Sequence, residues 1–213
     1  MSRMLKRTVT LCLVLGLTSM ALAQQQRPGI AGPGALLFNP DVKKELKLSD
    51  EQLSKLKNGL GKVMTKYQPH FEKFKKSPPT AEQAEKISKA FEDDSWKALT
   101  SVLDGKQTKR FQQILWQLGG LNALQDPDLQ KELNLKDEEK KKLEVIFKAR
   151  GKKLQELQSK RETSREKYEA VVKEAEEKIN GVLTNEQKKN LKELKGPKFE
   201  FSRPAPPPPP KKP

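Results

Sequence analysis

Apolar residues recur every three or four positions along most of this chain, which is the spacing of one helix face. The clearest run follows Ser49 and continues to Phe74, although Pro69 is expected to kink or interrupt that helix. A second helix is expected to open at Thr80, where T-A-E-Q forms a capping box. No segment shows the alternation of a strand, so the pattern predicts an all-α fold.

The second half of the chain shows the same periodicity, with one ambiguity. One apolar face runs from Leu143 to Leu157 and another from Tyr168 to Val182, and no glycine or proline lies between them. A hairpin turning near 159–163 is favoured, because T-S-R-E at 163–166 is again a capping box. One long helix over 137–182 is the alternative.

The chain contains an internal duplication. Residues 32–52 align with 119–139 without gaps, and eight of the fourteen positions from Asn39 onward are identical. The segment beginning at Val102 aligns with the one beginning at Val182, so the first copy carries seven additional residues, expected within 75–80. In both copies an Asn or Asp followed by proline marks the start of a short helix. Repetition at this period predicts tandem helical hairpins of elongated form.

The termini differ in composition from the repeats. Residues 1–23 combine a basic start, an apolar run and A-L-A, which predicts a secretory signal cleaved after Ala23. The expected organisation is 1–23 signal peptide, 24–38 linker, 39–118 first repeat, 119–195 second repeat and 196–213 disordered tail. Pro206–Pro210 in that tail predicts a polyproline II spacer.

Removal of the signal would leave a basic chain without cysteine. The signal holds three basic and no acidic residues, so the net charge falls from +15 to +12. Only His70 and Met64 remain as soft or imidazole ligands, which argues against a transition-metal site. No catalytic constellation is evident, so we expect no enzyme activity, no cofactor and no metal. Export and the lack of a basic motif interleaved with aromatics argue against nucleic acid.

A short motif recurs four times where a helix is expected to start. Leucine precedes a capping residue, and a Gln or Glu follows three residues later, as in a capping box. The members are Leu48, Ser49 and Gln52; Leu103, Asp104 and Gln107; Leu135 and Glu139; and Leu183, Thr184 and Gln187. The copies at Asp104 and at Lys136 are expected to be degraded, since Lys136 occupies a capping position. We interpret the motif as a helix-start device rather than a chemical site.

Paired L-[ST]-x-x-Q motifs in an exported, helical, cysteine-free basic chain resemble the Spy/CpxP family of periplasmic stress proteins. The resemblance covers Leu48–Leu118 and Leu135–Leu194. It implies helical hairpins whose two motifs meet at one end, and an ATP-independent chaperone or envelope-stress role. Known members form cradle-shaped dimers, so a homodimer is left open. This chain departs from the pattern at Glu139, where the family has Gln.

Lysine runs are the candidate client-binding residues. They are Lys73, Lys75 and Lys76 in the first repeat and Lys140, Lys141 and Lys142 in the second. Expected partners are unfolded or envelope proteins, steered by charge. A structural or cell-wall-associated protein that binds anionic wall polymer is the alternative, and any contact with a membrane is expected to be peripheral.

Overall fold

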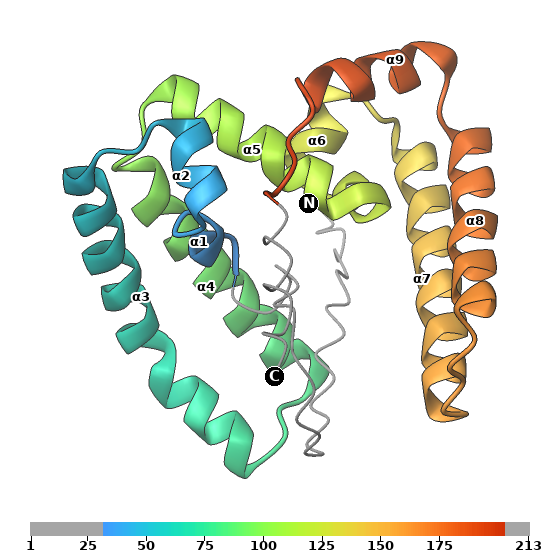
Figure 1. Ribbon diagram of the computed structural model, residues 1–213. Coiled ribbons are helices and arrows are strands. Elements are labelled where there is room, and N and C mark those ends of the chain that lie inside the picture. The colour runs from blue at the N-terminus through green and yellow to red at the C-terminus, as the bar shows by residue number, and fades with distance from the viewer. Residues whose placement is uncertain (1–31, 203–213) are drawn as a thin grey trace, which may run out of the picture. The chain divides into compact units, whose positions relative to one another are not determined.

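The computed structural model describes residues 32–202. Over this range the chain forms nine α-helices and one 3-10 helix and contains no strand, which confirms the all-α prediction (Figure 1). In chain order the elements are α1 (Gly32–Leu36), α2 (Pro40–Leu46), α3 (Asp50–Lys76), α4 (Ala81–Thr100), α5 (Gly105–Gly119), η1 (Gly120–Gln125), α6 (Pro127–Glu132), α7 (Asp137–Ser159), α8 (Arg165–Val182) and α9 (Asn185–Leu194). The expected signal peptide and the polyproline segment lie outside the described residues.

The described part of the chain divides into two compact units, residues 32–108 and 109–202. The sequence repeat places the division at 118/119 instead. The difference lies within α5, which begins in the first unit and continues into the second. Its Trp116 belongs to the buried core of the second unit, and the Trp116 indole donates a 3.0 Å hydrogen bond to Asp126. Packing therefore assigns most of α5 to the second unit, although its sequence repeats in α9.

In the first unit, α3 and α4 form a long hairpin, which α1 and α2 accompany (Figure 1). α3 continues through Pro69 to Lys76, so this proline does not interrupt the helix. The predicted capping box at Thr80 is present, with Gln83 as its partner. Leu36 and Leu37 lie in the segment that the sequence predicts to be linker, but both are buried. The linker therefore ends before α1, where Gly34 lies directly against Leu60 of α3.

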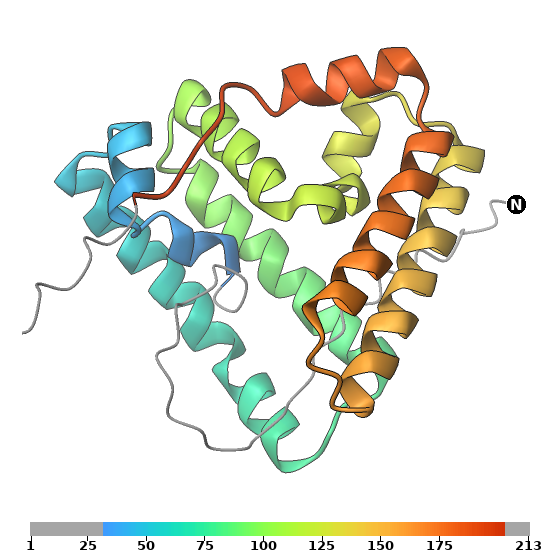
Figure 2. The same cartoon turned by 45° about the vertical axis from the view of Figure 1, so that its right-hand side comes forward.

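In the second unit, α7 and α8 form the corresponding hairpin and run side by side in both views (Figure 2). The chain turns at 160–164, which confirms the hairpin over the single long helix. The capping box expected at Thr163 is wrong by one residue, since Ser164 is the N-cap and its hydroxyl bonds to Glu166 instead of the backbone. The seven additional residues of the first copy lengthen its helices near the turn. α3 has 27 residues against 23 in α7.

The two short helices α2 and α6 start as the sequence predicts. Asn39 accepts from the backbone N–H groups of the first turn of α2, and Asp126 does the same for α6. Both helices are followed by a residue in the left-handed region, Lys47 at φ 51° and Asn134 at φ 50°. These residues occupy equivalent positions of the repeat, so both copies reverse the chain in the same way before their long hairpin.

The segment that follows α9 is held against α5. Gln117 donates 2.6 Å and 2.8 Å hydrogen bonds to the carbonyls of Lys195 and Pro197, and its side-chain oxygen accepts from Phe199 N–H at 2.8 Å. Arg110 donates to the Pro197 carbonyl at 2.9 Å. The extension predicted to begin at 196 therefore has an ordered first part, because polar side chains of α5 satisfy its backbone groups.

Candidate functional site

The repeated motif forms helix starts, as interpreted from the sequence. Ser49 Oγ accepts from Gln52 N–H at 3.1 Å, and Gln52 Oε1 accepts from Ser49 N–H at 3.1 Å. Thr184 and Gln187 make the same two bonds at 3.1 Å and 2.8 Å. Each pair satisfies two donors that a helix start would otherwise leave without partners.

The two copies expected to be degraded differ from each other. The copy at Asp104 is a complete capping box, with bonds of 2.8 Å and 3.0 Å to and from Gln107, so its expected degradation is wrong. A carboxylate accepts the N3 amide as well as a hydroxyl does. The copy at Lys136 keeps only the return bond from Lys136 N–H to Glu139, at 2.8 Å. The second bond of a capping box, from the Glu139 N–H to the side chain at position 136, is missing because the ammonium group of Lys136 has no acceptor atom.

In the first unit the motif also joins two helix starts that are distant in sequence. Gln52 Nε2 donates to Gln107 Oε1 at 2.7 Å, and Gln107 Nε2 donates to Gln52 Oε1 at 3.3 Å. The same two amides donate to backbone carbonyls, Gln52 to Val102 at 3.2 Å and Gln107 to Leu46 at 3.1 Å. We call this arrangement of Gln52 and Gln107 the amide clasp. It ties the start of α3 to the start of α5.

The second unit has an altered counterpart of the amide clasp. Gln187 is buried, and its Nε2 donates to Glu139 Oε2 at 3.0 Å. Hydrogen bonding from Lys136 N–H, and to a lesser extent from Gln187, lowers the pKa of Glu139. A carboxylate only accepts, so Glu139 is unable to donate to the Val182 carbonyl as Gln52 donates to Val102. The leucines of the motif support these junctions: Leu103, Leu135 and Leu183 are buried, and Leu48 is half-buried.

The clasp residues offer hydrogen bonds but no reactive group. Their side chains are amides, hydroxyls and single carboxylates, and all of them are engaged in fixing helix starts. Within residues 32–202, no group of three or more His, Cys, Asp or Glu side chains is placed to hold a metal ion. The hydrogen bonds of the motif residues are bonds that fix helix starts.

The predicted lysine runs lie at opposite ends of the repeated hairpin. Lys73, Lys75 and Lys76 are exposed in the last turn of α3, where Lys75 pairs with Glu72 at 2.8 Å. Lys140, Lys141 and Lys142 lie at the start of α7, next to the motif, where Lys140 pairs with Asp137 at 3.3 Å. The two runs occupy different places in the repeat, so they do not form one basic face that both copies share.

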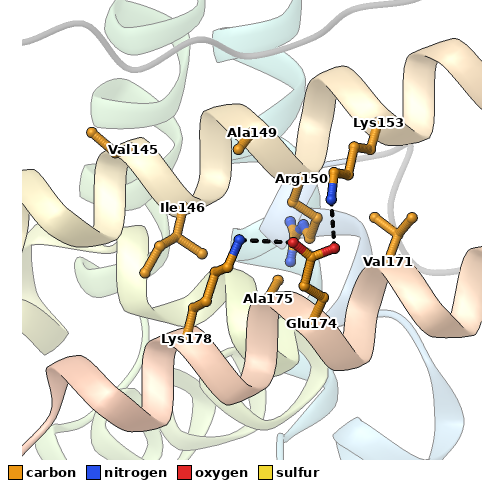
Figure 3. A pocket seen from close by; sticks show the side chains of 9 residues that line it. All are labelled: Val145, Ile146, Ala149, Arg150, Lys153, Val171, Glu174, Ala175 and Lys178. Atoms are coloured by element: carbon orange, nitrogen blue, oxygen red, sulfur yellow. Dashed lines mark hydrogen bonds and ion pairs between the residues drawn. The ribbon is translucent and has the colours of Figure 1, made fainter.

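A shallow hollow between α7 and α8 combines apolar and cationic side chains (Figure 3). It encloses about 110 Å³. Its apolar lining residues are Val145, Ile146, Ala149, Val171 and Ala175, and its charged ones are Arg150, Lys153, Glu174 and Lys178. Val145 is 66% exposed, the largest exposed fraction among the large hydrophobic side chains of the described residues. The helical spacing of 145, 149 and 153 and of 171, 174, 175 and 178 places these residues on facing sides of the two helices.

Glu174 lies between two lysines of this hollow. Lys153 approaches one carboxylate oxygen from α7, and Lys178 donates to the other at 2.7 Å from within α8 (Figure 3). Hydrogen bonds from Lys153 and then from Lys178 lower the pKa of Glu174 to about 2. The carboxylate is therefore ionised at any physiological pH, and the hollow holds three cations and one anion.

Arg150 is the innermost cation of the hollow. Its guanidinium donates to Asn122 of η1 and lies 5.1 Å from the ring centre of Phe147. Its buried Nε has no hydrogen-bond partner among the described residues, and burial lowers the pKa of the group. A cation with an unsatisfied donor favours the approach of an acceptor.

Sequence reasoning missed this hollow, although the repeat carried a signal for it. Lys66 and Asp94 of the first unit occupy the positions equivalent to Lys153 and Glu174, and they form the same pair between helices at 2.6 Å. Aligning the charged residues of the two copies would have revealed a repeated pairing of α3 with α4 and of α7 with α8. The apolar side chains around the pair differ between the copies.

Comparison with known proteins returned no relative. No family model matches the chain, and neither a curated protein nor a solved structure matches it. Within residues 32–202, no helix has both the length and the apolar character needed to span a membrane.

Proposed function

We propose that this chain is an exported, non-enzymatic, ATP-independent chaperone-like or envelope-stress protein of the Spy/CpxP-like type, which binds unfolded clients through a basic and apolar helical surface. The observation that carries the proposal is the hollow on α7 and α8, which the exposed Val145 lines together with the cations Arg150, Lys153 and Lys178. Exposed apolar surface rimmed by charge is typical of an interaction site.

The basic side chains and the apolar lining act at different stages of binding. Long-range attraction from the basic chain raises the rate at which acidic, unfolded segments arrive. Contact with the apolar lining then holds them, because it removes apolar surface of both partners from water. A shallow hollow buries little area, so each contact is weak and clients exchange rapidly. Rapid exchange suits a protein that prevents aggregation without an energy source.

The amide clasp supports this role indirectly. It fixes the starts of helices, so the hairpin surfaces are present before a client arrives. Binding to a preformed surface loses less free energy to the ordering of side chains and backbone. The motif residues are accordingly expected to affect stability more than client contact.

The test is suppression of aggregation. A chemically unfolded client is diluted with and without the chain from Gln24 onward, at low and at high salt, and light scattering is followed. Suppression is expected at low salt and is expected to weaken as salt screens the charges over about 10 Å or less. Absence of suppression at low salt would overturn the proposal.

The alternative, a structural or wall-associated protein, is favoured by the ordered start of the C-terminal extension. Gln117 and Arg110 hold the backbone near Pro197, so the chain leaves the second unit from a defined place on α5. Sedimentation with purified peptidoglycan distinguishes the two functions, with a chain ending at Ser202 as the control. Binding that requires the extension would support the alternative, and absence of binding would exclude it.

A further inference from the structure

The hairpins of both units contain the same ion pair between helices, but its surroundings differ. In the first unit, Asp94 accepts from Lys66 at 2.6 Å and from the Tyr67 hydroxyl at 2.9 Å. The Tyr67 ring meets Phe91 edge-on at 5.5 Å, and Phe71 meets Phe91 in the same way. Tyr67 is buried. Aromatic side chains therefore fill the space beside this carboxylate.

In the second unit the aromatic side chains are missing from the equivalent positions. Tyr67, Phe71 and Phe91 correspond to Leu154, Gln158 and Val171. Two cations appear instead, since Arg150 replaces Val63 and Lys178 replaces Ala98. Of the three smaller residues, Val171 lines the hollow beside Glu174. Its carboxylate is held by lysines alone, at the rim of an apolar depression.

The ion pairs of Glu174 are exchangeable. The Glu174 side chain is 40% exposed, and those of Lys153 and Lys178 are 47% and 55% exposed. Pairs this open to water contribute little net stability, because water solvates the separated charges almost as well. A carboxylate from another molecule can therefore replace that of Glu174 at little cost, provided that it brings a favourable contact of its own.

We propose that Glu174 is an internal occupant of a carboxylate-binding site, and that this site takes client segments in which an Asp or Glu adjoins an aliphatic side chain. The inference rests on the proposed function and specifies its ligand. The client carboxylate pairs with Lys153 and Lys178 as Glu174 turns to solvent. The aliphatic side chain enters the hollow between Val145 and Val171.

The size of the hollow selects the aliphatic partner. An apolar cavity of about 150 Å³ accommodates benzene. The hollow encloses about 110 Å³, which suits a branched aliphatic side chain better than an aromatic ring. Glu174 competes with the client carboxylate for the two lysines. A client segment therefore binds only if it offers both a carboxylate and an aliphatic side chain that enters the hollow.

The proposal predicts that removing the internal carboxylate strengthens binding. The probes are three fluorescent peptides of equal length, one with Asp-Leu and Glu-Val pairs, one with the acids replaced by their amides, and one with the aliphatic residues replaced by serine. Their affinities for the chain from Gln24 onward are measured by fluorescence anisotropy at low salt. Glu174→Gln is expected to raise the affinity for the acidic-aliphatic peptide about fivefold and to leave the affinity for the amide peptide unchanged. Joint replacement of Lys153 and Lys178 by methionine is expected to weaken the same peptide about tenfold.

Matched controls separate a local site from a general gain of charge. Asp94→Asn removes the equivalent carboxylate of the first unit and changes the net charge by the same amount. Asp93→Asn does so on the exposed face of α4, and it replaces the first control if Asp94→Asn lowers helicity. Both are expected to change peptide affinity less than twofold. The inference would be overturned if Glu174→Gln did not raise the affinity for the acidic-aliphatic peptide, or if the control variant raised that affinity equally.

The two proposals fail separately. Suppression of aggregation by the unmodified chain, combined with no preference among the three peptides, rejects the carboxylate site and leaves the chaperone function standing. Absence of suppression rejects the chaperone function. Selective peptide binding in that case would still establish the carboxylate site.

Discussion

Replacing Gln52 and Gln107 by methionine, singly and together, tests whether the amide clasp acts as one unit. Methionine matches glutamine in length and in helix propensity, so the substitution removes hydrogen bonds with little change of shape. Each glutamine side chain takes part in four hydrogen bonds, two of which are the bonds between the glutamines themselves.

The magnitude follows from these bonds. A buried or half-buried hydrogen bond contributes about 0.5–1.5 kcal/mol net, and water compensates for part of the loss where a group is exposed. Each single substitution is therefore expected to lower the free energy of unfolding by about 2–4 kcal/mol. Because the two shared bonds are lost only once, the double variant should fall short of the sum by about 1–2 kcal/mol.

Urea unfolding followed by tryptophan fluorescence measures this coupling. The chain has two tryptophans, so a common Trp116→Phe background leaves Trp96 of α4 as the reporter of the first unit. The matched control pairs Gln52→Met with Gln83→Met, which removes a capping-box glutamine at the start of α4. Additive effects of Gln52→Met and Gln107→Met, within about 0.3 kcal/mol, would refute the clasp.

Two further predictions concern the second unit. Gly196→Ala is expected to destabilise it by about 1–3 kcal/mol in thermal unfolding, since residue 196 has φ +67° and an added Cβ would lie 2.4 Å from Gln113 Oε1. Gly105→Ala is the control, because nothing lies within 4 Å of its Cβ position, and an equal loss in both variants would contradict the reasoning. Glu139→Gln is expected to reduce the acid sensitivity of the unfolding free energy. The pKa of Glu139 is lowered from 4.5 in the folded chain, so its carboxylate contributes stability that is present above about pH 4.5 and is lost as the pH falls through the folded-state pKa. Identical pH dependence of the two chains below that value would show that Glu139 has no part in it.

The starts of the helices were accessible from the sequence because they depend on neighbours three residues apart. Asn39, Ser49, Thr80 and Thr184 all cap helices as predicted. The errors also lie at this local level: Asp104 is the cap that the motif predicts, but its copy is complete rather than degraded, and the cap of α8 is Ser164 rather than Thr163. The error at α8 arises because Thr163 and Ser164 are adjacent and both residue types cap helices.

The partners of the glutamine amides were less accessible. Gln52 and Gln107 are 55 residues apart, and the capping pattern already accounts for one bond of each side-chain oxygen. The resemblance implied that two motifs meet at one end of a hairpin, but the amide-to-amide bonds and the bond to the Leu46 carbonyl depend on where the helices pack.

By itself, the sequence determined the helical class, the duplication and most helix starts, because periodicity and capping are properties of short segments. Only the tertiary structure decided that α5 divides between the two units, that the backbone around Pro197 lies against α5, and that a hollow opens beside Glu174. Those outcomes depend on side-chain volume and polarity across a helix interface. Tyr67 and Phe91 pack together beside the ion pair of the first hairpin, whereas Val171 replaces Phe91 and lines the hollow of the second. The same repeat thereby yields two different surfaces.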